Sequence, residues 1–311
     1  MRGAIGAAYG ADVPPIEYDE MALFRENAEE AGLTYPGPPT VERVWVEVAP
    51  GRRLSALRWG TSDPELVLLH GGAQNAHTWD TVALALGRPL VAIDLPGHGH
   101  SDWRDDKAYW PTENALAVAT TVRELAPNAS MVVGMSLGGL TALALSRHAP
   151  ELVRRLVLVD VTPGVNREKA SAVTAFIAGP ESFASFDEIL DRTVAFNPTR
   201  SVSSLRRGIR HNASERPDGT WAWRYDRFDL PEGTTVPDFG ALWDHFDALG
   251  VPLMLVRGAD SPVVDDVDVV ELKRRRPEAR VEVVAGAGHS VQGDQPVELA
   301  RLIEDHLRGA S

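Results

Sequence analysis

The sequence lacks cysteine altogether, in a chain of 311 residues. Disulfide bonds, thiolate catalysis and thiolate metal sites are therefore excluded. The chain also has fewer basic than acidic residues. It contains 31 Lys and Arg residues and 44 Asp and Glu residues, which give a formal net charge of −13. This balance argues against nucleic acid and against an anionic membrane surface as partners.

Long apolar runs are missing as well. None approaches the roughly 20 residues needed to cross a bilayer, and Met1 to Asp12 contains one Arg and no apolar run of signal-peptide length. We therefore expect a cytoplasmic protein that does not enter the membrane. Hydrophobic residues make up 44% and charged residues 24% of the chain, so the length suits one large α/β domain with an inserted lobe.

The most informative segment that is present runs from Met131 to Pro150. An apolar run ending at Met135 is typical of a buried strand, and apolar residues then recur at helical spacing. Between them, Gly134-Met135-Ser136-Leu137-Gly138 fits the pattern G-x-S-x-G. A serine at such a sharp strand-to-helix turn presents its hydroxyl, and the N–H of Leu137 would face an anion forming beside it. A glycine-rich turn around an inert buried serine is the plainer alternative.

The rest of the chain alternates strands and helices, which predicts an α/β protein whose mostly parallel sheet is flanked by helices. The predicted strands cover 41–48, 54–59, 66–69, 89–93, 131–135, 155–161, 252–256 and 280–284. The predicted helices outside the lobe cover 17–32, 76–86, 112–125, 137–149, 265–276 and 296–307. The first two strands read as an antiparallel hairpin at one edge of the sheet.

The alternation stops at Pro163, and we interpret the following segment as a cap over the carboxyl ends of the strands. The predicted division is an N-terminal helical extension at 1–40, a core at 41–163 and 250–311, and a cap at 164–249. Helix-like segments lie in the cap near 167–178, 185–196, 201–211 and 239–249. Its aromatic residues are expected either to line a substrate pocket or to pack within the cap; they are Phe176, Phe183, Phe186, Phe196, Trp221, Trp223 and Phe246.

Three residues with matched chemistry each follow the end of a predicted strand: Ser136, Asp260 and His289. The ends of parallel strands lie on one side of a sheet, so the three side chains can meet. A serine hydroxyl needs a base, and an imidazole titrates near neutral pH. The imidazole in turn needs a carboxylate that fixes its tautomer. The order Ser, Asp, His along the chain fits this architecture.

Other carboxylates compete for the acidic role. Asp160 also ends a strand, the one directly after the strand that leads to Ser136, and is the main rival of Asp260. Asp265 and Asp266 fall where the next helix is predicted to begin, so they are expected to serve as helix caps.

A second oxyanion donor is expected from the loop at 70–75, which follows a buried strand. Its glycines let the backbone bend over the edge of the sheet. The N–H of Gly72 is the first choice and that of Ala73 the second, while His70 is expected to brace the loop through a hydrogen bond.

Metal and cofactor binding are not expected. His98 and His100 share a glycine-rich loop at 94–101, but neither a third ligand nor orienting partners accompany them. A scaffold role fits this loop better, with Asp94 and Ser101 bonding to backbone groups.

Taken together, these segments resemble the α/β-hydrolase superfamily over roughly residues 41–308. The resemblance is carried by His70-Gly71-Gly72, by 94–101, by Gly134 to Gly139, by Arg257-Gly258-Ala259-Asp260 and by Gly288-His289. It implies an eight-stranded sheet, a cap after the sixth strand and a Ser-Asp-His triad. The superfamily members that this chain resembles, those with Ser at the nucleophile position, are mostly carboxylesterases, lipases, lactonases, peptidases and carbon–carbon bond hydrolases. Epoxide hydrolases and haloalkane dehalogenases carry Asp there, so Ser136 argues against both.

The expected function is that of a serine hydrolase that cleaves a small, largely apolar carboxylic ester or lactone through an acyl-enzyme. A carbon–carbon bond hydrolase or a cofactor-free lyase on the same residues is the alternative. A ligand receptor with the hydrolase fold is a minor alternative.

Overall fold

The computed structural model describes residues 18–165, 168–198, 200–227 and 238–309. Its central sheet has eight strands in the order β1-β2-β4-β3-β5-β6-β10-β11. The strands are β1 (Val41–Ala49), β2 (Arg52–Trp59), β3 (Leu66–Leu69), β4 (Leu90–Ile93), β5 (Met131–Met135), β6 (Leu156–Val159), β10 (Leu253–Gly258) and β11 (Arg280–Val284). In the part of the chain described, no helix has both the length and the apolar character of a membrane span. The cytoplasmic location stays a prediction.

The direction of the strands confirms the predicted fold class. β1 pairs with β2 and β2 with β4 in antiparallel fashion, whereas all pairs from β4 to β11 are parallel. The hairpin of β1 and β2 therefore occupies one edge, as expected. In the parallel part, every strand presents its carboxyl end on the same side of the sheet.

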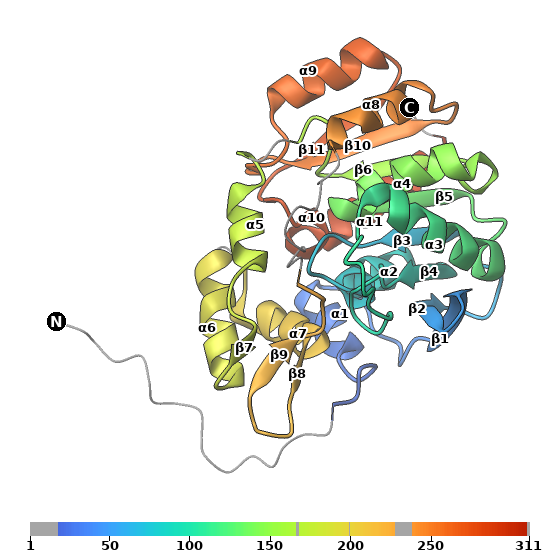
Figure 1. The fold of residues 1–311 in the computed structure, drawn as a ribbon. Helices are drawn as coiled ribbons and strands as arrows, with labels where there is room; N and C mark the ends of the chain where they lie inside the picture. The colour runs from blue at the N-terminus through green and yellow to red at the C-terminus, as the bar shows by residue number, and fades with distance from the viewer. Residues whose placement is uncertain (1–17, 166–167, 199, 228–237, 310–311) are drawn as a thin grey trace.

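Helices cover both faces of the sheet, which explains why its central strands are apolar throughout (Figure 1). Successive side chains of a strand point to opposite faces. Leu69 thus packs with one face's cluster, which includes residues of α3 (Pro111–Leu125), α4 (Leu137–His148), α8 (Leu242–Asp247) and α9 (Asp266–Arg275). Leu68 packs with the other, which includes residues of α1 (Phe24–Glu30), α2 (Asp80–Leu86) and α11 (Pro296–Leu307).

The cap forms a separate layer beside this sandwich (Figure 1). It contains α5 (Ser171–Ile177), α6 (Phe186–Phe196), α7 (Val202–Asn212) and the short strands β7 (Ser182–Phe183), β8 (Ala213–Glu215) and β9 (Trp221–Trp223). These strands form a second, antiparallel sheet in the order β7-β9-β8. The predicted cap range also includes α8, which packs on α4 of the core. Residues 228–237 of that range lie outside the described residues.

The N-terminal helix α1 joins core and cap, a role that the sequence did not indicate. On one side, Phe24 packs against Trp59 of β2 with ring centroids 4.9 Å apart. On the other, Asn27 Oδ1 accepts a 2.7 Å hydrogen bond from Arg207 Nε of α7, and Glu30 accepts another from the same guanidinium. The helix therefore holds the cap against the sheet. Residues 1–17 of the predicted extension lie outside the described residues.

A buried charge network lies next to this junction. Nδ1 of His77 is 2.9 Å from Asp80 Oδ2, and its Nε2 is 3.1 Å from Glu20 Oε2. Arg43 donates to Glu20 as well, and the ring of His211 stacks on His77 at 3.8 Å. Burial lowers the pKa of His77, but the carboxylates of Asp80 and Glu20 outweigh it and raise the pKa to about 9. His77 is therefore a cation within the folded protein at neutral pH.

This raised pKa predicts a stability that depends on pH. The folded-state pKa exceeds the ordinary value of 6.5, so the contribution of His77 is complete below about pH 6.5 and is lost as the pH rises through about 9. The difference between the folded-state pKa of His77 and its ordinary value corresponds to about 3 kcal/mol of unfolding free energy. Urea unfolding at intervals between pH 6 and 10 should show the decline in wild type and a flatter profile in His77→Gln.

The matched control for this prediction is the exposed His148. His148→Gln should reproduce the wild-type profile. If His77→Gln declined between pH 6.5 and 9 as steeply as wild type, the network would have to be described without a charged His77.

Candidate active site

Ser136 occupies the turn between β5 and α4, in a backbone conformation that side chains rarely adopt. Its φ is +50° and its ψ −117°, which costs on the order of 1–3 kcal/mol. Three glycines make the turn possible. A Cβ on Gly138 would lie 2.3 Å from the carbonyl oxygen of Leu69, and one on Gly134 would lie 2.4 Å from that of Gly138. A Cβ on Gly139 would lie 2.5 Å from Val161 Cγ1.

His289 meets Ser136 across the ends of the strands, as the sequence predicted. It lies in the loop after β11, directly before the short helix α10 (Val291–Asp294). Its Nε2 is 3.2 Å from Ser136 Oγ, and its Nδ1 is 2.7 Å from Asp160 Oδ2. The ring thus connects a hydroxyl on one side with a carboxylate on the other, the arrangement that proton transfer from the hydroxyl requires.

The prediction that Asp260 is the carboxylate partner of His289 is wrong on this geometry. It lies in an exposed turn after β10, where its backbone N–H donates to Ala287 O at 3.0 Å. Its side chain makes no hydrogen bond or ion pair with any residue that the structure describes. The rival Asp160 takes the place beside His289 because it comes from the adjacent strand β6 and is fully buried next to the imidazole.

Asp160 is held by three partners that together fix its carboxylate. Oδ1 accepts a 3.0 Å hydrogen bond from the N–H of Gly258, and Oδ2 accepts one of 2.5 Å from the hydroxyl of Ser261. The backbone is again left-handed, with φ +50°. A buried carboxylate without such donors would be strongly disfavoured. The sequence contained a signal for this residue, because Asp160 interrupts an apolar run between Val159 and Val161.

The two predicted oxyanion donors lie beside the serine. The N–H of Leu137 begins α4, and Gly72 and Ala73 line the same cavity as Ser136. Among the described residues, none of these three N–H groups has a hydrogen-bond acceptor, so each is available to a ligand. The N–H groups of Gly72 and Ala73 both fit the role of the second oxyanion donor.

Contacts with neighbouring segments, and one contact within the loop itself, hold the loop that carries Gly72. His70 braces it as expected, with Nδ1 2.7 Å from Gly71 O and Nε2 2.9 Å from the N–H of Leu95. From the cap, Asn212 Nδ2 donates to Ala73 O at 2.7 Å. Within the loop, Gln74 Oε1 accepts the N–H of Gly71 at 3.1 Å. In addition, the side-chain amide of Gln292 in α10 lies 3.3 Å from Gln74 Oε1.

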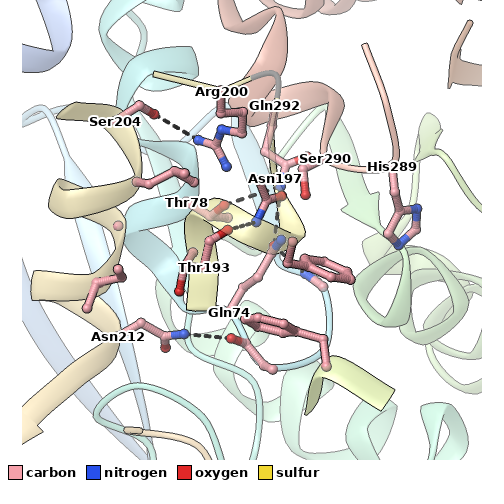
Figure 2. A pocket seen from close by; sticks show the side chains of 18 of the residues that line it. Gln74, Thr78, Thr193, Asn197, Arg200, Ser204, Asn212, His289, Ser290 and Gln292 are labelled. Atoms are coloured by element: carbon pink, nitrogen blue, oxygen red, sulfur yellow. Dashed lines mark hydrogen bonds between the residues drawn. The ribbon is translucent and has the colours of Figure 1, made fainter. Parts of the chain in front are cut away.

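A cavity of about 450 Å³ opens between the cap and these residues (Figure 2). Its lining includes the apolar side chains of Ala172, Val173, Phe176, Ile177 and Phe196. Of the seven aromatic residues predicted in the cap, Phe176, Phe196 and Trp223 line the cavity. The other four pack elsewhere: Phe183, Phe186 and Trp221 inside the cap, and Phe246 in the core.

Two groups of histidines contain side chains of the types that bind metal ions. In the loop at 94–101, His98 Nδ1 lies 2.9 Å from Pro96 O, and burial lowers the pKa of His98 to about 3. This neutral, hydrogen-bonded ring fits a scaffold. Ligand atoms of His77, Asp80 and His211 lie within 4.8 Å of one another. Both nitrogens of His77 already bond to carboxylates, so the arrangement is that of an ion-pair network.

The fold and this site agree with one family. Residues 64–296 match the model described as "alpha/beta hydrolase fold". The chain belongs to the α/β-hydrolase family. It is 50% identical over 296 residues to "Esterase Rv0045c" of Mycobacterium tuberculosis, an alignment that covers 93% of this chain and 96% of that protein. A solved structure of that esterase has a TM-score of 0.84 and covers 94% of this chain and 99% of its own. The prediction of a carboxylesterase-like enzyme acting on ester bonds is thereby confirmed.

More distant relatives vary in their substrates. An "sn-1-specific diacylglycerol lipase ABHD11" of Xenopus laevis is 28% identical, and the alignment covers 79% of this chain and 80% of that protein. The structure of E-2-(acetamidomethylene)succinate hydrolase has a TM-score of 0.74 at 22% identity, covers 87% of this chain and 100% of its own, and supports the fold alone. The family therefore fixes the fold and does not fix the substrate.

Proposed function

We propose that this α/β-hydrolase cleaves a small carboxylic ester or lactone through an acyl-enzyme, with Ser136 as nucleophile, His289 as base and Asp160 as the carboxylate. The single observation that carries the proposal is the pair of contacts made by His289, 3.2 Å to Ser136 Oγ and 2.7 Å to Asp160 Oδ2. A serine hydroxyl is a weak nucleophile unless an oriented base accepts its proton.

The first half of the reaction forms the acyl-enzyme. Ser136 Oγ attacks the ester carbonyl while Nε2 of His289 takes the hydroxyl proton, and Asp160 stabilises the imidazolium through Nδ1–H. The N–H groups of Leu137 and Gly72, with Ala73 as second choice, donate to the oxyanion. Each such donor contributes about 3–4 kcal/mol to lowering the barrier. His289 then protonates the departing alcohol.

The second half releases the acid. A water molecule gives a proton to His289 and attacks the acyl carbon, and the same donors stabilise the second oxyanion. Collapse of this intermediate breaks the bond to Ser136 Oγ, which takes the proton back from His289. The apolar wall formed by Phe176, Ile177 and Phe196 favours a largely apolar group next to the reacting carbonyl, because burying such a group in the cavity removes apolar surface from water.

A panel of p-nitrophenyl esters of rising chain length, lactones and amides tests the proposal. We expect many turnovers on esters or lactones, with acid and alcohol formed in equal amounts from an ester. Absence of turnover on every ester and lactone of the panel would favour the alternative activity, that of a carbon–carbon bond hydrolase or a lyase. Tight binding followed by one slow turnover would assign a ligand receptor.

A further inference from the structure

Arg200 connects the reaction cavity with a second one. It directly precedes Ser201, the N-cap of α7, and its side chain lines both the cavity that holds Ser136 and an adjoining polar cavity. In Figure 2, Ser204 lies at the upper left of the side chains drawn, Arg200 lies beside it toward the top, and His289 lies at the right. A ligand bound at Ser136 can therefore extend to this guanidinium within one continuous space.

The guanidinium of Arg200, on a side chain that is 23% exposed, has few partners within the protein. Nη2 donates to Ser204 Oγ at 2.9 Å. Nε is buried without a hydrogen-bond acceptor, and within the described residues Nη1 has none either. The carboxylate of Asp294 comes only to 3.6 Å from Nε. Burial lowers the pKa of Arg200, as expected for a cation that its surroundings compensate incompletely.

Arg207, which lines the same two cavities, shows the contrast. Its Nε donates to Asn27 at 2.7 Å, its Nη1 donates to Ser203 at 2.7 Å, and its Nη2 bonds to Glu30. All three nitrogens of that guanidinium have acceptors within the protein. Arg207 therefore serves to hold α1 on the cap, whereas Arg200 keeps donors that no protein group uses.

Asp294 does not neutralise Arg200 fully, because its carboxylate has another task. Oδ2 accepts a 2.9 Å hydrogen bond from the N–H of Gly288, the residue before His289. The helix that carries Asp294 also passes close to Arg200, since a Cβ on Gly293 would lie 2.7 Å from Arg200 Nη2. The guanidinium thus rests on α10 with part of its hydrogen-bonding capacity unfilled. A guanidinium fork matches the geometry of a carboxylate.

We propose that the substrate is an ester carrying a second, free carboxylate, and that Arg200 binds this carboxylate while Ser136 attacks the ester. This inference rests on the proposed function and adds a substrate class to it. The apolar wall between the two points would hold the chain that connects ester and carboxylate. Arg200 is then a specificity-determining residue.

Matched pairs of esters test the inference. One series consists of monomethyl esters of dicarboxylic acids of rising length, each paired with the methyl ester of the monocarboxylic acid of equal length. A second series places the carboxylate on the alcohol side, as O-acetyl derivatives of ω-hydroxy acids paired with neutral alkyl acetates. For each pair, the ratio of kcat/KM for the anionic ester to kcat/KM for the neutral ester is measured in wild type, Arg200→Gln and Arg206→Gln.

We expect one length in one series at which wild type prefers the anionic ester. Arg200→Gln should lower this ratio by about 10- to 100-fold, the value of a hydrogen bond to a charged group, chiefly through KM. Arg206 lies exposed on the same helix α7, so Arg206→Gln removes an equal charge outside the cavity and should leave the ratio at the wild-type value.

Two results would overturn the inference while the proposed function stood. One is hydrolysis of neutral esters with no preference for the anionic partner in either series. The other is an equal loss for both members of a pair in Arg200→Gln, which would make Arg200 a structural link between cap and α10. Absence of all ester turnover would instead contradict the proposed function. If Arg200→Gln fails to fold, Ser204→Ala removes the group that orients Nη2 and should lower the same ratio to a smaller extent.

Discussion

Replacing Ser136 by alanine should lower kcat for ester hydrolysis by about 10⁵- to 10⁶-fold, the effect expected when the nucleophile of a serine hydrolase is removed. Among the described residues, Ser136 is the one whose hydroxyl oxygen has a hydrogen-bond contact with His289 Nε2, at 3.2 Å, so the variant lacks the group that this imidazole would activate. Alanine accepts the same left-handed backbone at a similar cost, so the fold should survive. Steady-state kinetics on the best ester of the panel, with circular dichroism and thermal unfolding, would measure both effects.

A matched control is available on the same helix. Ser146 of α4 also carries a hydroxyl, which donates to Leu143 O at 2.7 Å and lies away from the cavity. Ser146→Ala should retain wild-type kinetics. Turnover by Ser136→Ala within a factor of about 10 of wild type would contradict the assignment of Ser136 as the nucleophile. Such a factor corresponds to only about 1.4 kcal/mol in the activation barrier.

Replacing Asp160 by asparagine should lower kcat by about 10⁴-fold while the geometry persists. Asparagine tolerates a left-handed backbone, and its carbonyl oxygen can still accept the N–H of Gly258. Its NH₂ group would then face Nδ1 of His289, which must become the acceptor. The proton of the neutral imidazole would move to Nε2 and point at Ser136, so the ring could no longer serve as base.

Asp260→Asn is the companion variant, because Asp260 was the carboxylate predicted from the sequence. Asp260 is exposed, and its side chain makes no hydrogen bond or ion pair with His289, so the change should leave kcat and KM at their wild-type values. The opposite pattern, with Asp260→Asn inactive and Asp160→Asn active, would require a rearrangement of the loops after β6 and β10 that brings Asp260 to the imidazole.

Much of the fold could be predicted because local patterns determine it. Continuous apolar runs such as Leu66 to Leu69 are required by strands buried on both faces, and glycine and proline mark where these strands end. The turn at Ser136 was predictable for the same reason. Gly134 and Gly138 leave room that any Cβ would fill, so the requirement is visible in the sequence itself.

The choice between Asp160 and Asp260 depends on contacts that local patterns do not contain. Both residues follow strands, and those strands, β6 and β10, are neighbours in the sheet. The decision comes from the N–H of Gly258 and the hydroxyl of Ser261, both provided by the segment next to Asp260, which turn toward Asp160. The apolar neighbours of Asp160 were the better guide, because a carboxylate in an apolar run requires dedicated partners.

Features that join distant segments were not predictable either. The charge network around His77 unites residues from the N-terminal segment, β1 and the cap, such as Glu20, Arg43 and His211. Arg200 belongs to the cap and Asp294 to the C-terminal part of the chain, yet Arg200 Nε lies 3.6 Å from Asp294 Oδ1. No periodicity or spacing in the sequence reports such pairs, because tertiary packing alone creates them.

The most direct measurement of the central claim is the site of covalent labelling by a fluorophosphonate, which reacts with an activated serine. Intact-mass and peptide analysis of the labelled wild-type protein should find one adduct, on Ser136. Labelling should be far slower in Asp160→Asn and absent in Ser136→Ala. An adduct on another residue, or an enzyme that stays fully active while Ser136 carries no label, would contradict the account.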